Sequence, residues 1–151
     1  IAPHVVSDSH LKEILDKVKR PCIRYTEATE ENVTQADCLI IDCYGLLSSI
    51  YRYGEISYIG GGFGVGIHNV LEAAVYGIPV IFGPNNKKFR EAQHLLEQKG
   101  GFEVTGYDDF KRLMDKFLSD KACLQQAGKA AGNYVNHNAG ALEKIMKDIT
   151  L

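Results

Sequence analysis

The stretch from Tyr58 to Glu72 reads Tyr-Ile-Gly-Gly-Gly-Phe-Gly-Val-Gly-Ile-His-Asn-Val-Leu-Glu, and it decides the fold. Its start closes a short apolar run, Ile56–Ile59, which is typical of a buried strand, and its end opens a helical pattern over 69–76. Five of the seven residues from Gly60 to Gly66 are glycine, which lets the backbone take positive φ and approach a ligand closely. A strand, a glycine-rich loop and a helix in this order indicate a phosphate site, because the amides of a helix start attract anions.

The spacing of the glycines argues against two standard nucleotide-binding loops. A dinucleotide-binding loop needs glycines at i, i+2 and i+5, but the third position is Val65 counted from Gly60 and Ile67 counted from Gly62. A P-loop needs Gly-Lys-Ser/Thr, and Gly66 is followed by Ile67. The loop therefore predicts an anion site that uses neither the common NAD nor the common ATP arrangement.

Outward from this stretch, short apolar runs alternate with helical patterns. The runs, whose length favours strands, are Cys22–Tyr25, Cys38–Asp42, Ile56–Ile59, Pro79–Phe82 and Phe102–Val104. The helical patterns cover 8–19, 46–53, 69–76, 87–99, 108–119, 121–136 and 140–149, with Asp8 as the expected cap of the first and a break near Asn138–Gly140. This alternation predicts a Rossmann-like, doubly wound α/β fold with a parallel sheet, in one domain over 1–151.

Composition excludes several classes of protein. The chain has 151 residues, 45% of them hydrophobic, and a formal net charge of -2, so neither a disordered chain nor a nucleic-acid binder is expected. No apolar run is long enough to span a bilayer, and we expect this piece to be soluble. The opening Ile-Ala-Pro-His suggests a piece of a longer protein.

The chain has four cysteines, Cys22, Cys38, Cys43 and Cys123. Their spacing is not that of a zinc site, and we expect them to be free thiols in a reducing cytosol.

A second loop follows the next predicted strand and begins with Gly83, Pro84 and Asn85. These are turn-forming residues, and the following Lys87 and Lys88 fit a solvated helix start. Because ligands bind at the carboxyl ends of parallel strands, we expect this loop to lie beside the glycine loop and to share its cleft.

Three polar residues between the glycine loop and its helix each allow two interpretations. Asn69 with Glu72 three residues later resembles a capping box, whereas a carboxylate beside such a loop can instead bind ribose hydroxyls. His68 is either an exposed turn residue or a donor to a phosphate or a sugar carboxylate.

The sequence resembles one family along almost its whole length. The matching segments are Gly60–Phe63, Gly66–Ala73, Tyr76–Asn85, Lys88–Ala92, Ala2–His4, Asp42–Leu47 with Ile50-Tyr51, and Asn138–Ala141. They are similar to the C-terminal half of 3-deoxy-D-manno-octulosonic acid (Kdo) transferases. These glycosyltransferases have two Rossmann-like domains in the GT-B arrangement. They transfer Kdo from CMP-Kdo to a lipid A precursor, with inversion, during lipopolysaccharide biosynthesis at the cytoplasmic face of the inner membrane.

The resemblance implies a role for each candidate residue. Gly61, Gly62, Phe63, Gly64 and Asn69 would surround the CMP phosphate, Glu72 would hold the ribose, Gly45 and Leu46 would lie near the base, His68 would lie near phosphate or the Kdo carboxylate, and His4 would face the cleft. It also implies that the acceptor site and the general base lie in an N-terminal domain absent from this chain. The chain alone would then be inactive, with no catalytic residue of its own.

Backbone amides can stabilise a leaving phosphate electrostatically, and the sequence has no Asp-x-Asp signature. We therefore expect neither a metal nor a cofactor beyond the donor substrate. Two alternatives stay open. One is the nucleotide-sugar domain of another GT-B enzyme that uses a UDP-sugar, either a glycosyltransferase or an epimerase. The other is a non-catalytic nucleotide-binding module.

Overall fold

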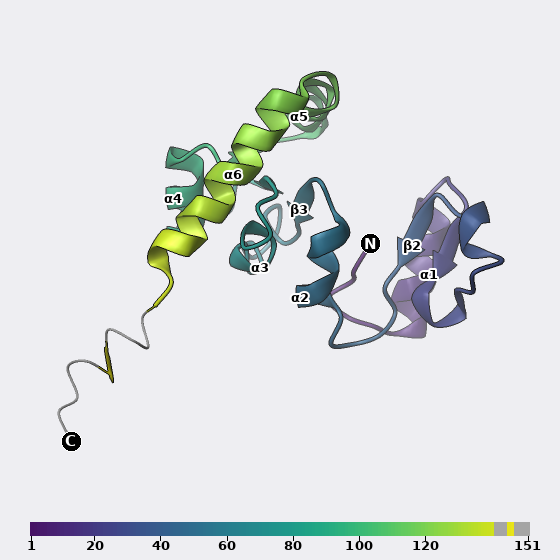
Figure 1. Cartoon of the computed structure of the whole chain (residues 1–151). Helices are drawn as coiled ribbons and strands as arrows, with labels where there is room; N and C mark the ends of the chain where they lie inside the picture. Colours follow the sequence, from purple (N-terminus) through teal and green to yellow (C-terminus); the bar gives the residue numbers. More distant parts are fainter. Residues whose placement is uncertain (141–144, 147–151) are drawn as a thin grey trace. The chain divides into compact units, whose positions relative to one another are not determined.

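The structure is a computed structural model that describes residues 1–140 and 145–146. It divides into two compact units, an N-terminal unit over Ile1–Ile50 and a C-terminal unit from Tyr51 onward. Figure 1 labels the helices α1 to α6 and the strands β2 and β3 of these units. The prediction of one domain over 1–151 stays a prediction.

The N-terminal unit contains a two-stranded parallel sheet. Its elements in order are α1 (Asp8–Lys17), β1 (Cys22–Arg24), 3₁₀ turns at Tyr25–Glu27 and Val33–Gln35, β2 (Cys38–Ile40) and α2 (Leu47–Ile50). The predicted cap of α1 was wrong by one residue. Ser7 is the N-cap, because it has an extended backbone and its side chain accepts a hydrogen bond from the His10 amide. Asp8 instead occupies the first turn, where a carboxylate is favoured by the helix dipole.

The C-terminal unit contains a three-stranded parallel sheet in the order β3-β4-β5. Its elements are a 3₁₀ turn at Tyr51–Tyr53, β3 (Ser57–Ile59), α3 (Leu71–Ala74), β4 (Val80–Phe82), α4 (Arg90–Glu97), β5 (Gly101–Glu103), α5 (Tyr107–Ser119) and α6 (Lys121–Asn138). The predicted α/β class with parallel strands is confirmed, and the five predicted strands lie in two sheets.

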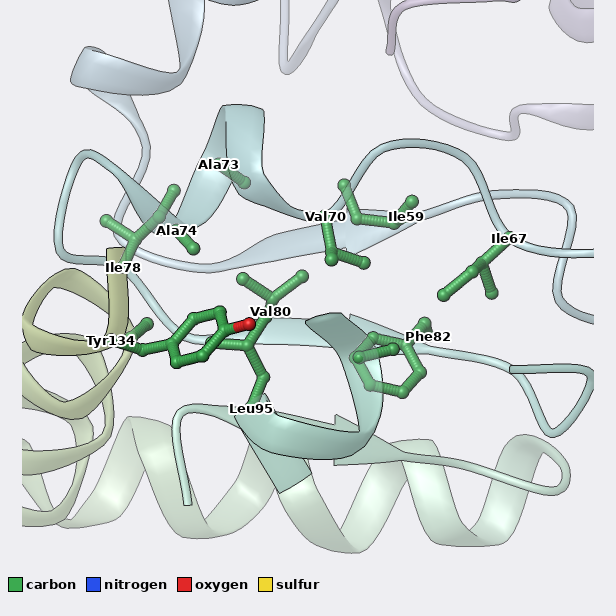
Figure 2. Close-up of a cluster of buried hydrophobic side chains, with 12 residues drawn as sticks. Ile59, Ile67, Val70, Ala73, Ala74, Ile78, Val80, Phe82, Leu95 and Tyr134 are labelled. Atoms are coloured by element: carbon green, nitrogen blue, oxygen red, sulfur yellow. The ribbon is translucent and has the colours of Figure 1, made fainter. Parts of the chain in front are cut away.

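The sheet of the C-terminal unit is covered on both faces, as a doubly wound fold requires. Its central strand alternates: Val80 and Phe82 join the core cluster formed with α3, α4 and α6, whereas Ile81 joins a second cluster with Phe117 of α5. Figure 2 shows the first cluster, in which Leu95 of α4 packs beside Val80 and Phe82. All three β4 side chains are fully buried, and burial of each such side chain contributes about 1.5–3 kcal/mol.

The long helix α6 ends at Asn138, which confirms the predicted break there. The further helix predicted over 140–149 lies mostly outside the described residues. Within the ranges 1–140 and 145–146, no helix combines the length and the apolar character needed to cross a bilayer.

Candidate functional site

The glycine loop closes on itself directly after β3. The carbonyl oxygen of Gly61 accepts hydrogen bonds from the amides of Gly64 and Gly66, at 2.9 and 3.2 Å. Gly61 has a φ of +87°, and a Cβ there would lie 2.1 Å from the carbonyl oxygen of Gly66. Only glycine fits this position. The amides of Gly64 and Gly66 therefore already donate hydrogen bonds within the loop.

Two other amides of the loop point to where an anion could bind. Among the described residues, the amides of Phe63 and Val65 have no hydrogen-bond acceptor. Both residues are exposed, with 58% and 102% of their surface accessible. Unpaired backbone donors at a loop tip can bind an anion, so Phe63 and Val65 are better placed than Gly64 to donate to one.

The second loop lies directly against the glycine loop, as the sequence predicted. A Cβ on Gly62 would come within 2.5 Å of the Gly83 nitrogen, and a Cβ on Gly83 would come within 2.7 Å of the Gly62 carbonyl carbon. Asn85 ties the loops together: its amide donates to the Gly62 carbonyl at 2.9 Å, and its side-chain Nδ2 donates to the Gly64 carbonyl at 2.6 Å. The two loops thus form one rigid surface at the carboxyl ends of β3 and β4.

A buried asparagine that the sequence does not single out supports the second loop. Asn86 is 1% exposed. Its Nδ2 donates to the Gly83 carbonyl at 2.9 Å and to Glu103 Oε2 at 2.6 Å, and its Oδ1 accepts from Gln93 Nε2 at 2.6 Å. No sequence signal distinguishes Asn86 from the adjacent exposed Asn85, because both are ordinary turn residues.

Beyond the glycine loop, α3 begins at Leu71, two residues later than predicted. Asn69 Oδ1 accepts from the Leu71 amide at 3.0 Å, and Asn69 Nδ2 donates to Glu72 Oε1 at 3.0 Å. The predicted capping box is therefore not formed. The N-cap of α3 is Val70, which has no side-chain cap, and the Glu72 carboxylate accepts from the Asn69 side chain instead of a backbone amide. The amide of His68 donates to the Gly60 carbonyl, so the chain returns to the start of the glycine loop.

The charge of the Glu72 carboxylate also affects the pKa of Tyr51. The pKa of the Tyr51 phenol is raised, mainly by burial and further by the negative charge of Glu72. Tyr51 packs against the core cluster of Figure 2. Glu72 therefore lies at the edge of the core with one oxygen held by Asn69, and a ribose hydroxyl could donate to such a carboxylate.

An apolar cavity of about 410 Å³ adjoins the glycine loop through Phe63. It is lined by Tyr58, Phe63, Val104, Gly106, Tyr107 and Phe110. The rings of Tyr58 and Phe110 meet edge to face with centroids 5.9 Å apart. No local sequence pattern predicts this cavity, because its wall combines residues of β3 with the start of α5.

The remaining predicted site residues belong to the N-terminal unit. Gly45 has a φ of +87° and open space where a Cβ would project, and Leu46 is half-buried beside it. His4 is exposed near the start of the chain. Their part in the site stays a prediction.

Asp42, in the same segment as Gly45, has a structural environment that was not predicted. Its side chain is fully buried. It accepts from Thr26 Oγ1 at 2.6 Å, from the Thr26 amide at 3.0 Å and from Arg24 Nε at 2.8 Å. These hydrogen bonds, the Thr26 hydroxyl first, lower the pKa of Asp42 to about 2. Asp42 therefore joins β1 to the segment that carries Gly45.

Within the described part of the chain, no group of three or more His, Cys, Asp or Glu side chains could hold a metal ion. The expectation that the site works without metal or cofactor stays a prediction.

No family model matches the chain, but it is similar to several curated proteins. A 3-deoxy-D-manno-octulosonic acid transferase of Haemophilus influenzae is 30% identical over 146 residues, which are 95% of this chain and 33% of the relative. The Rickettsia felis protein of that name is 28% identical over 145 residues, 93% of this chain and 31% of the relative. The one of Aquifex aeolicus is 37% identical over 89 residues, 58% of this chain and 25% of the relative. The chain thus spans about a quarter to a third of these relatives.

A solved structure shares the fold. It is the crystal structure of the C-terminal CMP-Kdo binding domain of WaaA from Acinetobacter baumannii, with a TM-score of 0.73 and 17% sequence identity. The match covers 84% of this chain and 67% of that chain. This chain therefore shares the fold of that domain.

Proposed function

We propose that this chain, which is similar in sequence to Kdo transferases, binds the CMP-Kdo donor as the C-terminal part of such a glycosyltransferase. One observation carries the proposal: the glycine loop and the second loop are locked together beside His68, Asn69 and Glu72. The resemblance to Kdo transferases supports this location for the donor.

The proposed chemistry is stabilisation of the leaving CMP. When the bond between Kdo and phosphate breaks, negative charge develops on the phosphate. The unpaired amides of Phe63 and Val65 would donate to this phosphate. His68, which follows the glycine loop, would lie near the phosphate or the Kdo carboxylate. Fixed donors of this kind need no reorganisation as the charge develops, which makes them effective in catalysis.

Glu72 would bind the ribose. Its carboxylate is already oriented by Asn69 Nδ2 at 3.0 Å, so little side-chain entropy is lost when a hydroxyl binds. We assign Gly45 and Leu46 to the base and His4 to the cleft, in line with the resemblance. The pyrimidine is expected to be cytosine.

The rest of the reaction belongs to the parts of the relatives that this chain does not span. We propose that the acceptor is a lipid A precursor, that the general base lies in an N-terminal domain, and that the whole enzyme acts at the cytoplasmic face of the inner membrane. By this proposal the chain alone binds the donor without transferring Kdo.

Calorimetric titration of the chain with CMP, UMP and NAD tests the proposal, with Glu72→Gln and Glu97→Gln as variants. CMP is expected to bind more tightly than UMP, and NAD is expected not to bind. Glu72→Gln should lower the affinity for CMP by about tenfold or more, because a hydrogen bond to a charged group contributes about 1.5–3 kcal/mol. Its melting temperature should stay unchanged, since the glutamine oxygen can still accept from Asn69. Glu97, exposed on α4, is the matched control and should leave CMP affinity unchanged.

Each contrary result has a defined meaning. Equal or tighter binding of UMP would favour a GT-B enzyme that uses a UDP-sugar. Unchanged CMP affinity in Glu72→Gln would remove the ribose role, and a folded chain that binds no CMP would contradict donor binding by this chain.

A further inference from the structure

Two cysteines lie side by side on the adjacent strands of the N-terminal unit. Cys22 begins β1, Cys38 begins β2, and the register of the two parallel strands pairs them directly. Residues paired in this way project to the same face of a sheet. Neighbouring strands lie about 4.8 Å apart, which falls within the range of Cα separations of about 4.4–6.8 Å that disulfides span.

The two thiols also interact. The pKa of the Cys22 thiol is raised by burial and, next, by the neighbouring Cys38 thiol, while Cys22 Sγ donates to the Arg20 carbonyl oxygen at 3.2 Å. Both side chains are half-buried, so a small reagent can reach them while the strands keep them adjacent. The other two cysteines have no such partner strand. Cys43 follows β2, and Cys123 belongs to α6 and packs against the second core cluster of the C-terminal unit.

We propose that Cys22 and Cys38 form a dithiol that a small disulfide, such as oxidised glutathione, converts to an intramolecular disulfide. One cysteine, as thiolate, attacks the reagent, breaks its S–S bond and releases one reduced thiol, leaving a mixed disulfide. The other cysteine attacks the protein sulfur of the mixed disulfide and releases the second reduced thiol. Two electrons and two protons pass from the protein to the reagent, and one S–S bond replaces another.

The resulting bond would be reversible and local. A partly exposed disulfide between adjacent strands is of the labile kind that thiols reduce readily. It would cross-link the first residues of β1 and β2. Four residues after Cys38, Asp42 already joins the same two segments through its hydrogen bonds with Arg24 and Thr26. Oxidation would therefore add a covalent link to a pairing that already exists, without requiring a new fold.

Oxidised glutathione applied to the folded 151-residue chain tests the proposal. After unfolding, the four thiols of the reduced chain should fall to two, with a peptide that links Cys22 to Cys38. Cys22→Ser should yield no internal bridge and instead a glutathione adduct at Cys38. Cys43→Ser and Cys123→Ser are the matched controls and should still form the bridge. Dithiothreitol should restore all thiols.

Three results would overturn the proposal. Four titratable thiols after oxidation would show that the pair does not react. Separate glutathione adducts on Cys22 and Cys38 would show that the sulfurs cannot reach each other. A bridge that includes Cys43 or Cys123 would show that the strand register does not direct the reaction.

Discussion

Replacing Gly62 with alanine should separate the two loops of the candidate site. The added Cβ would lie 2.5 Å from the Gly83 nitrogen and 2.7 Å from its Cα. Both are backbone atoms at the end of β4, so no side-chain rotation can relieve the overlap. The φ of Gly62 is not positive, and the expected damage is therefore steric and not torsional.

The size of the effect follows from this geometry. Overpacking at a rigid contact typically costs about 1–3 kcal/mol in unfolding free energy. Gly64→Ala is the matched control, because Gly64 is in the same loop, also lacks a positive φ, and has its nearest neighbour, the Gly61 oxygen, at 3.6 Å. A Gly→Ala change at such an open position stabilises by about 0.4–1 kcal/mol. The two variants should thus shift stability in opposite directions.

Urea unfolding and native-state hydrogen exchange together test this prediction. Gly62→Ala should unfold at lower urea, and the Asn85 amide, which donates to the Gly62 carbonyl, should exchange faster. The reasoning fails if Gly62→Ala unfolds within about 0.5 kcal/mol of the wild type and the Asn85 amide stays protected. Gly83→Ala should behave similarly. The double variant should cost less than the sum of the two, because both changes widen the same contact.

Two further predictions concern polar residues, one in the second loop and one that follows β2 in the N-terminal unit. Asn86→Ala removes three side-chain hydrogen bonds. It should lower the unfolding free energy by about 1–3 kcal/mol in urea titration, whereas the exposed Lys87→Ala should change it little. Asp42 has a folded pKa of about 2 against an ordinary 3.8, so it stabilises the fold above about pH 4 and loses that contribution as the pH falls toward 2. The gap in urea midpoint between wild type and Asp42→Asn should therefore narrow over that interval. A gap that is constant with pH would show that the carboxylate is not preferentially ionised in the folded protein.

The elements of the fold were accessible from local pattern. Each predicted strand is found within one or two residues of its observed bounds, because short β-branched runs between helical patterns have few other ways to pair their backbones. Helix starts were less accurate. The cap of α1 is Ser7 and not Asp8, since either residue can cap a helix and the choice depends on which one has an extended backbone.

For the candidate site, the sequence located the two loops but not what holds them. The glycines from 60 to 66 predicted a tight loop, and the order of the strands predicted a second loop beside it. Neither pattern could identify Asn86 as the buried residue that supports Gly83, or show that Gly64 donates within its own loop.

By itself, the sequence determined a parallel α/β protein with a glycine loop at a strand end, and its resemblance to Kdo transferases extended over the whole chain. Those features depend on residue type and spacing along the chain, which a sequence states directly. Only the tertiary structure decided that Gly62 meets Gly83, that Cys22 lies beside Cys38, and that the buried Asp42 is hydrogen-bonded to Arg24 and Thr26. Each of these contacts depends on strand register or on the close approach of distant backbone segments. A glycine has no side chain to indicate its neighbour, and a short strand does not specify its partner's register.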